Sequence, residues 1–180
     1  MRELAYIIIA LVVFQRLAEL VYAERNTKAL LARGATEVGR AHYPLIVLLH
    51  ATWLIAIVAM LPHNPPVNFG LLAIFVILQG LRVWVLATLG SYWTTRIITL
   101  PGAPLVRRGP YRLLRHPNYA VVVGEIAVLP LVFGETWVAV VFTILNALIL
   151  AWRIRQENAA LALRRTIDPA PSAGISSAKG

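Results

Sequence analysis

Residues suited to polar chemistry gather in two stretches that lie far apart in the chain. The first, Gly109-Pro-Tyr-Arg-Leu-Leu-Arg-His-Pro-Asn-Tyr119, leads into an apolar run. Pro117 suits the first turn of a helix, so His116 would flank a helix amino terminus, where free N–H groups can receive an anion or a carboxylate. In the second, Arg153 and Glu157 are spaced to share one helix face. If the fold unites them, the two stretches can bind an anionic oxygen.

The elements that must position these residues are apolar. The chain has 180 residues, of which 59% are hydrophobic and 14% charged, whereas a soluble domain has about 25% charged residues. At about 1.5 Å per residue, three of the apolar runs can cross a membrane of about 30 Å, and the last two are shorter. The sequence predicts an all-α, multi-pass membrane protein with five transmembrane helices: Leu4–Tyr22, Tyr43–Leu61, Phe69–Leu89, Tyr119–Phe133 and Trp137–Trp152.

Between the last two runs lie only Gly134, Glu135 and Thr136, which predicts a tight antiparallel hairpin. Residue 116 lies 19 positions before Glu135 and residue 154 lies 19 after it. The hairpin should therefore bring His116, Asn118 and Tyr119 beside Arg153 at one membrane surface. A helix continuing past the membrane would carry Glu157.

The distribution of cations predicts the orientation. Lys and Arg gather between the first two runs, between the third and fourth, and after the fifth, whereas the connections 62–68 and 134–136 hold none. By the positive-inside rule, the amino terminus is outside, and the long connections, the active site and the carboxyl terminus are cytoplasmic, in a bacterial inner or cell membrane. Arg2 is the one cation on the wrong side.

Composition also excludes several function classes. The net charge of +9 is confined to segments beside apolar runs, which favours anionic lipid headgroups over nucleic acid. The chain has no cysteine, and its four histidines are scattered, so no metal site is expected. We expect one membrane-embedded domain over residues 1–165 and a disordered tail over 166–180.

Polar side chains inside the predicted spans are informative because lipid penalises them. Glu125 lies six residues, about 9 Å, into the fourth run, and folding the hairpin brings Asn146 to nearly the same level. Two interpretations remain open. Glu125 forms a structural hydrogen bond with Asn146, or its carboxylate orients or deprotonates a substrate hydroxyl.

Four other polar residues lie inside the predicted spans. Arg16 and Glu19 are three residues apart near a span end, where they can pair and snorkel to the interface. Arg82 can pair within the bundle or serve function. His50 is mid-span, where a packing role is favoured.

Taken alone, Arg153 and Glu157 could form an ordinary surface ion pair, worth only a few tenths of a kcal/mol. The sequence motifs that contain them favour a functional role. The elements Leu105-Val106-x-x-Gly109-Pro110-Tyr111-x-x-x-Arg115-His116-Pro117-x-Tyr119 and Arg153-x-x-x-Glu157-x-x-x-Leu161 resemble the signature of the isoprenylcysteine carboxyl methyltransferase family. The resemblance covers about residues 103–161. It implies an integral membrane enzyme that uses S-adenosylmethionine.

The amino-terminal part is similar to a bacterial branch associated with O-methylation of long-chain alkylresorcinols and alkylpyrones. The residues that carry this similarity are Glu19, Arg25-Asn26, Arg33-Gly34-Ala35, Glu37, Gly39, His42-Tyr43-Pro44, His50 and Glu125.

The family resemblance also implies residue roles. Arg153 would face the substrate oxygen, with Glu125 as a second catalytic candidate. The cofactor pocket would be lined by Leu105, Val106, Tyr111, His116, Pro117, Asn118, Tyr119 and Glu157. The family usually has two adjacent acids in its second element, whereas this chain has Asn158 after Glu157, so no role of the second acid carries over.

The resulting functional hypothesis is transfer of a methyl group to an oxygen of a lipophilic, membrane-dissolved substrate, most simply an alkylresorcinol or alkylpyrone. A phenol has a pKa of about 10 and must lose a proton before it can react. Arg153 could favour the phenolate, or Glu125 could accept the proton. A prenylated cysteine carboxylate is the alternative and needs no base. A non-catalytic lipid-binding or transport protein is the alternative from another class, although a transporter should show inverted repeats. The sequence fixes no oligomeric state.

Overall fold

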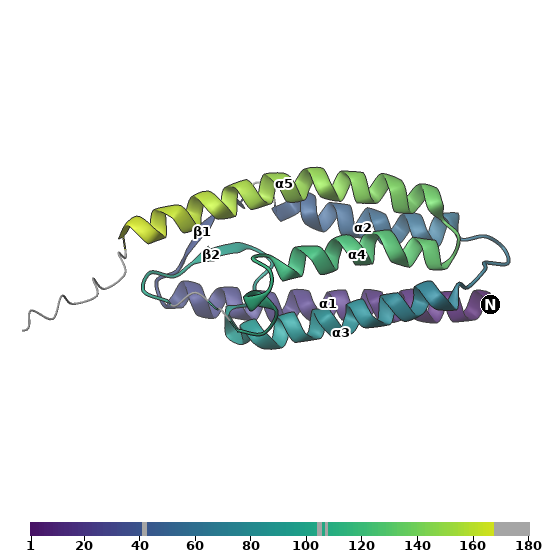
Figure 1. The fold of residues 1–180 in the computed structure, drawn as a ribbon, viewed down its shortest axis with the longest axis horizontal. Coiled ribbons are helices and arrows are strands. Elements are labelled where there is room, and N and C mark those ends of the chain that lie inside the picture. The colour runs from purple at the N-terminus through teal and green to yellow at the C-terminus, as the bar shows by residue number, and fades with distance from the viewer. Residues whose placement is uncertain (41–42, 104–105, 107, 168–180) are drawn as a thin grey trace, which may run out of the picture.

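The structure is a computed structural model that describes residues 1–40, 43–103, 106 and 108–167, with side chains described as far as residue 159. Five long helices run nearly parallel to the long axis of the molecule (Figure 1). They are α1 (Arg2–Ala32), α2 (Tyr43–Met60), α3 (Phe69–Leu89), α4 (Pro117–Val132) and α5 (Thr136–Ile167). The expected tail falls mostly on residues 168–180, outside the described residues.

The bounds of α2, α3 and α4 follow the predicted apolar runs closely, whereas α1 and α5 extend beyond theirs. The predicted span Phe69–Leu89 coincides with α3, and α2 ends one residue before the predicted Leu61. α1 continues to Ala32 instead of ending near Tyr22. α5 is one continuous helix from Thr136 to Ile167, so the span and the expected carboxyl-terminal helix form a single rod.

The helix set identifies a multi-pass membrane protein. Among the described residues, α1, α2, α3 and α5 are long and apolar enough to cross a membrane. α4 has 16 residues, about 24 Å of helix, and falls short of that length. By length and composition, four of the described helices are therefore candidate membrane spans. That α4 also spans the membrane stays a prediction.

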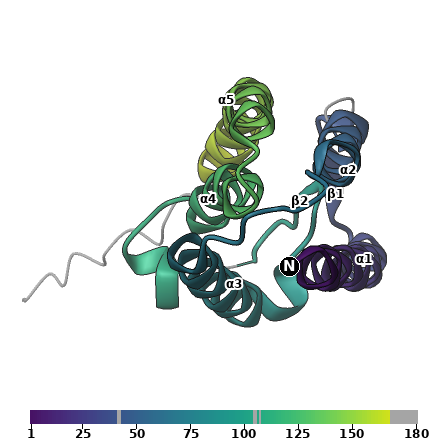
Figure 2. The same cartoon turned by 90° about the vertical axis from the view of Figure 1, so that its right-hand side faces the viewer.

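Viewed end-on, the helices are arranged around a common interior (Figure 2). Buried residues from all five long helices form one apolar cluster there. α4 lies between α3 and α5, and α5 also packs on α2. Trp53, Ile57, Leu129 and Phe133 fill the interior and are completely buried. Large apolar side chains such as Phe14, 72% exposed, cover the outside, which is the surface expected against lipid.

Both long connections lie at one end of the bundle, on the left in Figure 1, which we call the polar end. There β1 (Thr36–Val38) and β2 (Ile97–Thr99) form an antiparallel ribbon, in which Thr36 pairs with Thr99 and Val38 with Ile97. This ribbon is a departure from the expected all-α class. Its register is set between two segments about 60 residues apart, and such pairing has no local sequence signal.

At the opposite end, the loop between α4 and α5 is tight. Gly134 adopts φ +78°, a conformation that glycine tolerates best, and Glu135 follows it. The Glu135 side chain is buried, and neither carboxylate oxygen has a hydrogen-bond partner among the described residues. Burial raises the pKa of Glu135 to about 7.

This raised pKa makes stability depend on pH. Glu135 binds its proton more tightly in the folded protein than in the unfolded chain, so the folded state loses stability as pH rises from the unfolded pKa through about 7. We expect Glu135→Gln to raise the thermal unfolding midpoint at about pH 8 and to leave it unchanged at about pH 4. If wild type and Glu135→Gln had the same thermal unfolding midpoint at about pH 8 as well as at about pH 4, the result would contradict this account.

Candidate active site

Tyr119 joins the two distant sequence stretches at the polar end. Its hydroxyl accepts a hydrogen bond from Arg153 Nε at 2.8 Å and donates one to Glu157 Oε2. Tyr119 lies in the first turn of α4, whereas Arg153 and Glu157 lie one turn apart on α5. The helix arithmetic predicted that Tyr119 would meet Arg153, and the structure brings the two together. Arg153 and Glu157 are linked through this hydroxyl, not through the direct pair that their spacing suggests.

His116 completes one wall of the site. Its ring stacks on that of Tyr119, with 5.1 Å between centroids and 16° between planes. Its Nδ1 lies 3.9 Å from Glu157 Oε2, which is an ion-pair distance only when the imidazole is protonated. His116 also precedes α4, and its own side chain does not cap the helix. Pro117 has no N–H, and the N–H groups of Tyr119 and Ala120 donate to the His116 carbonyl at 3.1 and 3.4 Å. The Asn118 N–H is therefore the first-turn donor of α4 that could bind an anion.

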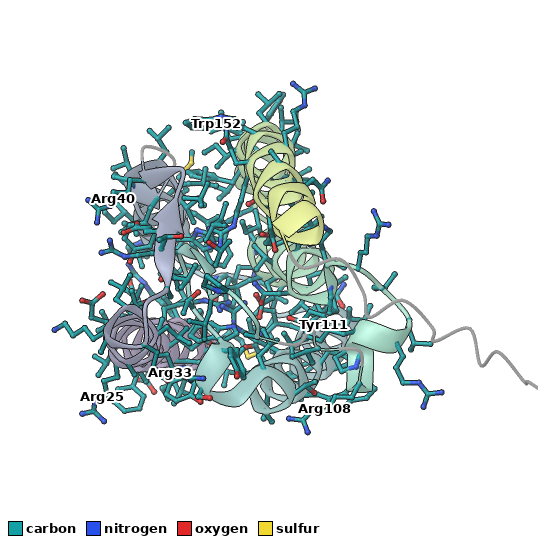
Figure 3. All side chains as sticks on the ribbon, turned by 90° about the vertical axis from the view of Figure 1, so that its left-hand side faces the viewer. Arg25, Arg33, Arg40, Arg108, Tyr111 and Trp152 are labelled. Atoms are coloured by element: carbon teal, nitrogen blue, oxygen red, sulfur yellow. The ribbon has the colours of Figure 1, made fainter. Side chains whose placement is uncertain are left out.

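Tyr111 lies on the short 3-10 helix η3 (Gly109–Arg112). Burial, together with the negative charge of Glu157, raises the pKa of the Tyr111 hydroxyl above its usual value, so Tyr111 remains a hydrogen-bond donor near Glu157. Figure 3 looks onto the polar end, with Arg25, Arg33, Arg40 and Arg108 around its rim and Tyr111 further in.

Gly109 allows η3 to lie close to α3. Its φ is +55°, and a Cβ at this position would lie 2.7 Å from Thr88 Oγ1 and 3.3 Å from Trp84 Nε1. Both facts favour glycine there. The close approach places the segment that carries Tyr111 and His116 against α3.

The remaining predicted cofactor residues are spread over this end. Pro117 is buried, Val106 and Asn118 are half-buried, and Leu105 lies outside the described residues. Asn118 Oδ1 is buried and has no hydrogen-bond partner within the described part of the chain. Asn158, which replaces the second acid, is exposed.

One contact of Arg153 was missed by sequence reasoning. Its Nη1 donates to the backbone carbonyl of Thr95 at 2.8 Å. Every residue has a backbone carbonyl, so the residue type at position 95 does not indicate this contact. The β-branched run Thr94-Thr95-Arg96-Ile97-Ile98-Thr99 is the one signal that could have indicated a strand there.

A second polar cluster lies deeper in the bundle and joins α1, α3 and α4. Arg82 donates to both carboxylate oxygens of Glu19, at 2.6 and 2.5 Å, and to Glu125 at 2.8 Å. Arg16 bridges the same two acids, at 3.0 Å to Glu19 and 2.8 Å to Glu125. Gln79 donates to the other oxygen of Glu125 at 2.8 Å. Two cations and two anions thus neutralise one another, as burial in lipid requires.

The cluster changes several expectations. Arg16 and Glu19 pair as expected, but their side chains are only 11% and 9% exposed, so they do not snorkel as an isolated pair. The Glu125–Asn146 hydrogen bond, one of the two interpretations of Glu125, is not found, and Asn146 Nδ2 has no partner among the described residues. The hairpin arithmetic gave depth along the helices but not the direction each side chain faces.

His50 has a packing role, and Arg82 pairs with acids within the bundle. His50 packs edge-on against Trp53 and contacts the Ile46 carbonyl through Nδ1 at 2.8 Å. Because a carbonyl only accepts hydrogen bonds, Nδ1 carries the proton.

Comparisons with known proteins relate this chain to one family. Residues 71–163 match the model of the isoprenylcysteine carboxyl methyltransferase (ICMT) family, and this range contains α4, η3 and the residues around Tyr119. An uncharacterized protein of Bacillus subtilis, YpbQ, is 38% identical over 87% of this chain and 95% of its own length. An uncharacterized protein of Haemophilus influenzae is 31% identical over 76% of this chain and 83% of its own length. No solved structure matches the chain. The chain therefore belongs to the isoprenylcysteine carboxyl methyltransferase family of membrane methyltransferases.

Proposed function

We propose that this protein transfers a methyl group from S-adenosylmethionine to an oxygen of a lipophilic, membrane-dissolved hydroxy compound of the alkylresorcinol or alkylpyrone class. The observation that carries the proposal is the Tyr119 hydroxyl, which joins Arg153 to Glu157 at the polar end. The polar end would face the cytosol, where the cofactor is dissolved, and the substrate would arrive from the bilayer.

The residues around Tyr119 fit a cofactor that carries both donors and acceptors. Glu157 offers a carboxylate to ammonium or hydroxyl donors, and the buried Asn118 Oδ1 offers an unused acceptor. The Asn118 N–H at the amino terminus of α4 would donate to the carboxylate of the cofactor's amino-acid part. Tyr111, His116, Pro117, Leu105 and Val106 would complete the pocket, as the family resemblance implies. When bound, S-adenosylmethionine supplies an electrophilic methyl group on a sulfonium.

Arg153 is the residue suited to the acceptor oxygen. Its side chain is held by Tyr119 and by the Thr95 carbonyl, so its charge sits at a fixed point beside the cofactor residues. A fixed guanidinium stabilises phenolate over phenol and thereby lowers the pKa of a bound hydroxyl. Because fixed dipoles and charges need no reorganisation during the reaction, they favour the charged oxygen throughout methyl transfer.

Glu125 contributes in a different way. Arg16 and Arg82 both bind its carboxylate, and Gln79 donates to the other oxygen, so three protein side chains already occupy the carboxylate. We therefore assign Glu125 to the contacts that hold α4 against α1 and α3, which fixes the start of α4 and with it Tyr119.

A prenylated cysteine carboxylate is the second candidate substrate, and the description of the matching family favours it. This acceptor is already ionised, so Arg153 would orient it without having to promote ionisation.

The test compares methyl transfer to the candidate substrates in parallel assays. Membranes enriched in the protein are incubated with methyl-labelled S-adenosylmethionine and either pentadecylresorcinol, a farnesylated cysteine analogue or a lipid extract of the host. Labelled products are identified by mass spectrometry. An O-methylated resorcinol is expected. Label on the cysteine carboxylate alone would favour the second substrate, and no labelled product from any of the three would contradict the proposal.

A further inference from the structure

The orientation of Arg153 depends on a segment far from it in the sequence. The Arg153 side chain donates from Nε to Tyr119 on one side and from Nη1 to Thr95 on the other, each at 2.8 Å. Two bonds from one planar guanidinium fix both its position and the direction of its plane. Tyr119 belongs to the rigid helix α4, so the variable element is the segment that carries Thr95.

Arg96, the next residue, anchors that segment to three other elements. Its Nη1 lies 3.2 Å from Glu37 Oε1 on β1, and its guanidinium carbon lies 4.6 Å from the ring centre of Tyr43, at the start of α2. Its Nη2 lies 3.8 Å from Glu24 on α1. Within the segment, Thr94 Oγ1 donates to the Arg96 carbonyl at 2.7 Å. The ribbon ties the backbone beyond Thr95 to β1, and Asn26 on α1 binds the Trp93 carbonyl before it. Next to Thr95 itself, the Arg96 side chain contacts α1, α2 and β1 together.

Glu37 makes this anchor stronger than a surface ion pair. Its side chain is only 4% exposed, whereas Arg96 is 30% exposed. A buried carboxylate needs a cation close by. Arg40 also binds Glu37, at 2.9 Å, but its side chain is 77% exposed, so solvent weakens that pair. Arg40 contacts the same carboxylate from the outside and thus provides a matched control.

We propose that Arg96 is a positioning residue for methyl transfer: held by Glu37 and Tyr43, it keeps the Thr95 carbonyl where that carbonyl receives Arg153. The inference rests on the proposed function, because it assigns Arg96 an effect on the residue that faces the acceptor oxygen. Without Arg96, Arg153 would keep its bond to Tyr119 but rotate about it.

The experiment compares Arg96→Ala and Arg96→Lys with the control Arg40→Ala in nanodiscs. Turnover is measured with methyl-labelled S-adenosylmethionine and pentadecylresorcinol, and thermal unfolding is followed for each variant. Because a small misplacement of a reacting group can cost about a hundredfold in rate, we expect Arg96→Ala to lower kcat by about tenfold or more. The KM for the cofactor should stay within about twofold, since the cofactor residues do not depend on Arg96. Arg96→Lys should recover part of the loss, and Arg40→Ala should behave as wild type.

A second measurement does not depend on turnover. In protein labelled with ¹⁵N-arginine, the Arg153 Nε–H signal is identified by its absence from Arg153→Lys. It should be sharp in the wild type and in Arg40→Ala and broadened in Arg96→Ala. An unchanged signal and unchanged kcat in a folded Arg96→Ala protein would overturn the positioning role. A wild type that methylates no acceptor while the signal broadens only in Arg96→Ala would contradict the proposed function and uphold the contact.

Discussion

Replacing Arg153 with alanine should lower turnover by about a hundredfold to a thousandfold, the usual cost of removing one fixed donor that stabilises a developing or existing oxygen anion. Arg153 is 9% exposed and bonds to both Tyr119 and Thr95, so water cannot take its place readily. The loss should fall mainly on kcat if the acceptor is a phenol, because ionisation of the hydroxyl then depends on the guanidinium.

The measurement is methyl transfer by purified protein in detergent or nanodiscs, with Arg155→Ala as the control. Arg155 lies two positions further along α5 and is exposed. Because it carries the same charge as Arg153, the variants Arg153→Ala and Arg155→Ala have equal net charge. Near-normal turnover in Arg153→Ala would remove this residue from the mechanism.

Replacing Arg82 with methionine should cost about 3–5 kcal/mol of stability, the usual effect of breaking a buried ion pair. Arg82 binds Glu19 and Glu125, whose side chains are 9% and 1% exposed. Without Arg82, one guanidinium, that of Arg16, would have to neutralise both carboxylates. The free energy of unfolding can be measured with denaturant in mixed micelles.

Two further variants separate charge from packing. Gln15→Leu removes a neutral donor to Glu19, at 3.0 Å, and should cost only about 1 kcal/mol. Adding Glu19→Gln to Arg82→Met removes an unpaired anion and should restore part of the stability. A folded Arg82→Met protein within about 1 kcal/mol of wild type would show that the cluster does not hold the bundle together.

The sequence was sufficient to predict the helices and the meeting of Tyr119 with Arg153. Both depend on quantities that are local: the length of an apolar run and the rise per residue on each side of a short loop. The same arithmetic placed His116 beside Arg153, whereas the structure stacks the His116 ring on Tyr119 and puts its Nδ1 3.9 Å from Glu157.

The contacts that were missed depend on how helices rotate about their own axes and on pairing between distant loops. One interpretation paired Glu125 with Asn146, yet the partners of Glu125 come from α1 and α3. The ribbon that joins Thr36 to Thr99 and the Thr95 carbonyl that receives Arg153 are long-range backbone features, which residue types do not encode.

Cofactor binding tests the central claim most directly, because it asks whether the residues that meet around Tyr119 form one site. S-adenosylmethionine is titrated by calorimetry into wild type, Glu157→Gln and Arg155→Ala in nanodiscs. The loss of one charge-assisted bond corresponds to about a tenfold to hundredfold loss of affinity. We predict saturable binding by wild type and Arg155→Ala and binding weaker by at least about tenfold in Glu157→Gln. No saturable binding by the wild type, or equal affinity in Glu157→Gln, would contradict the account.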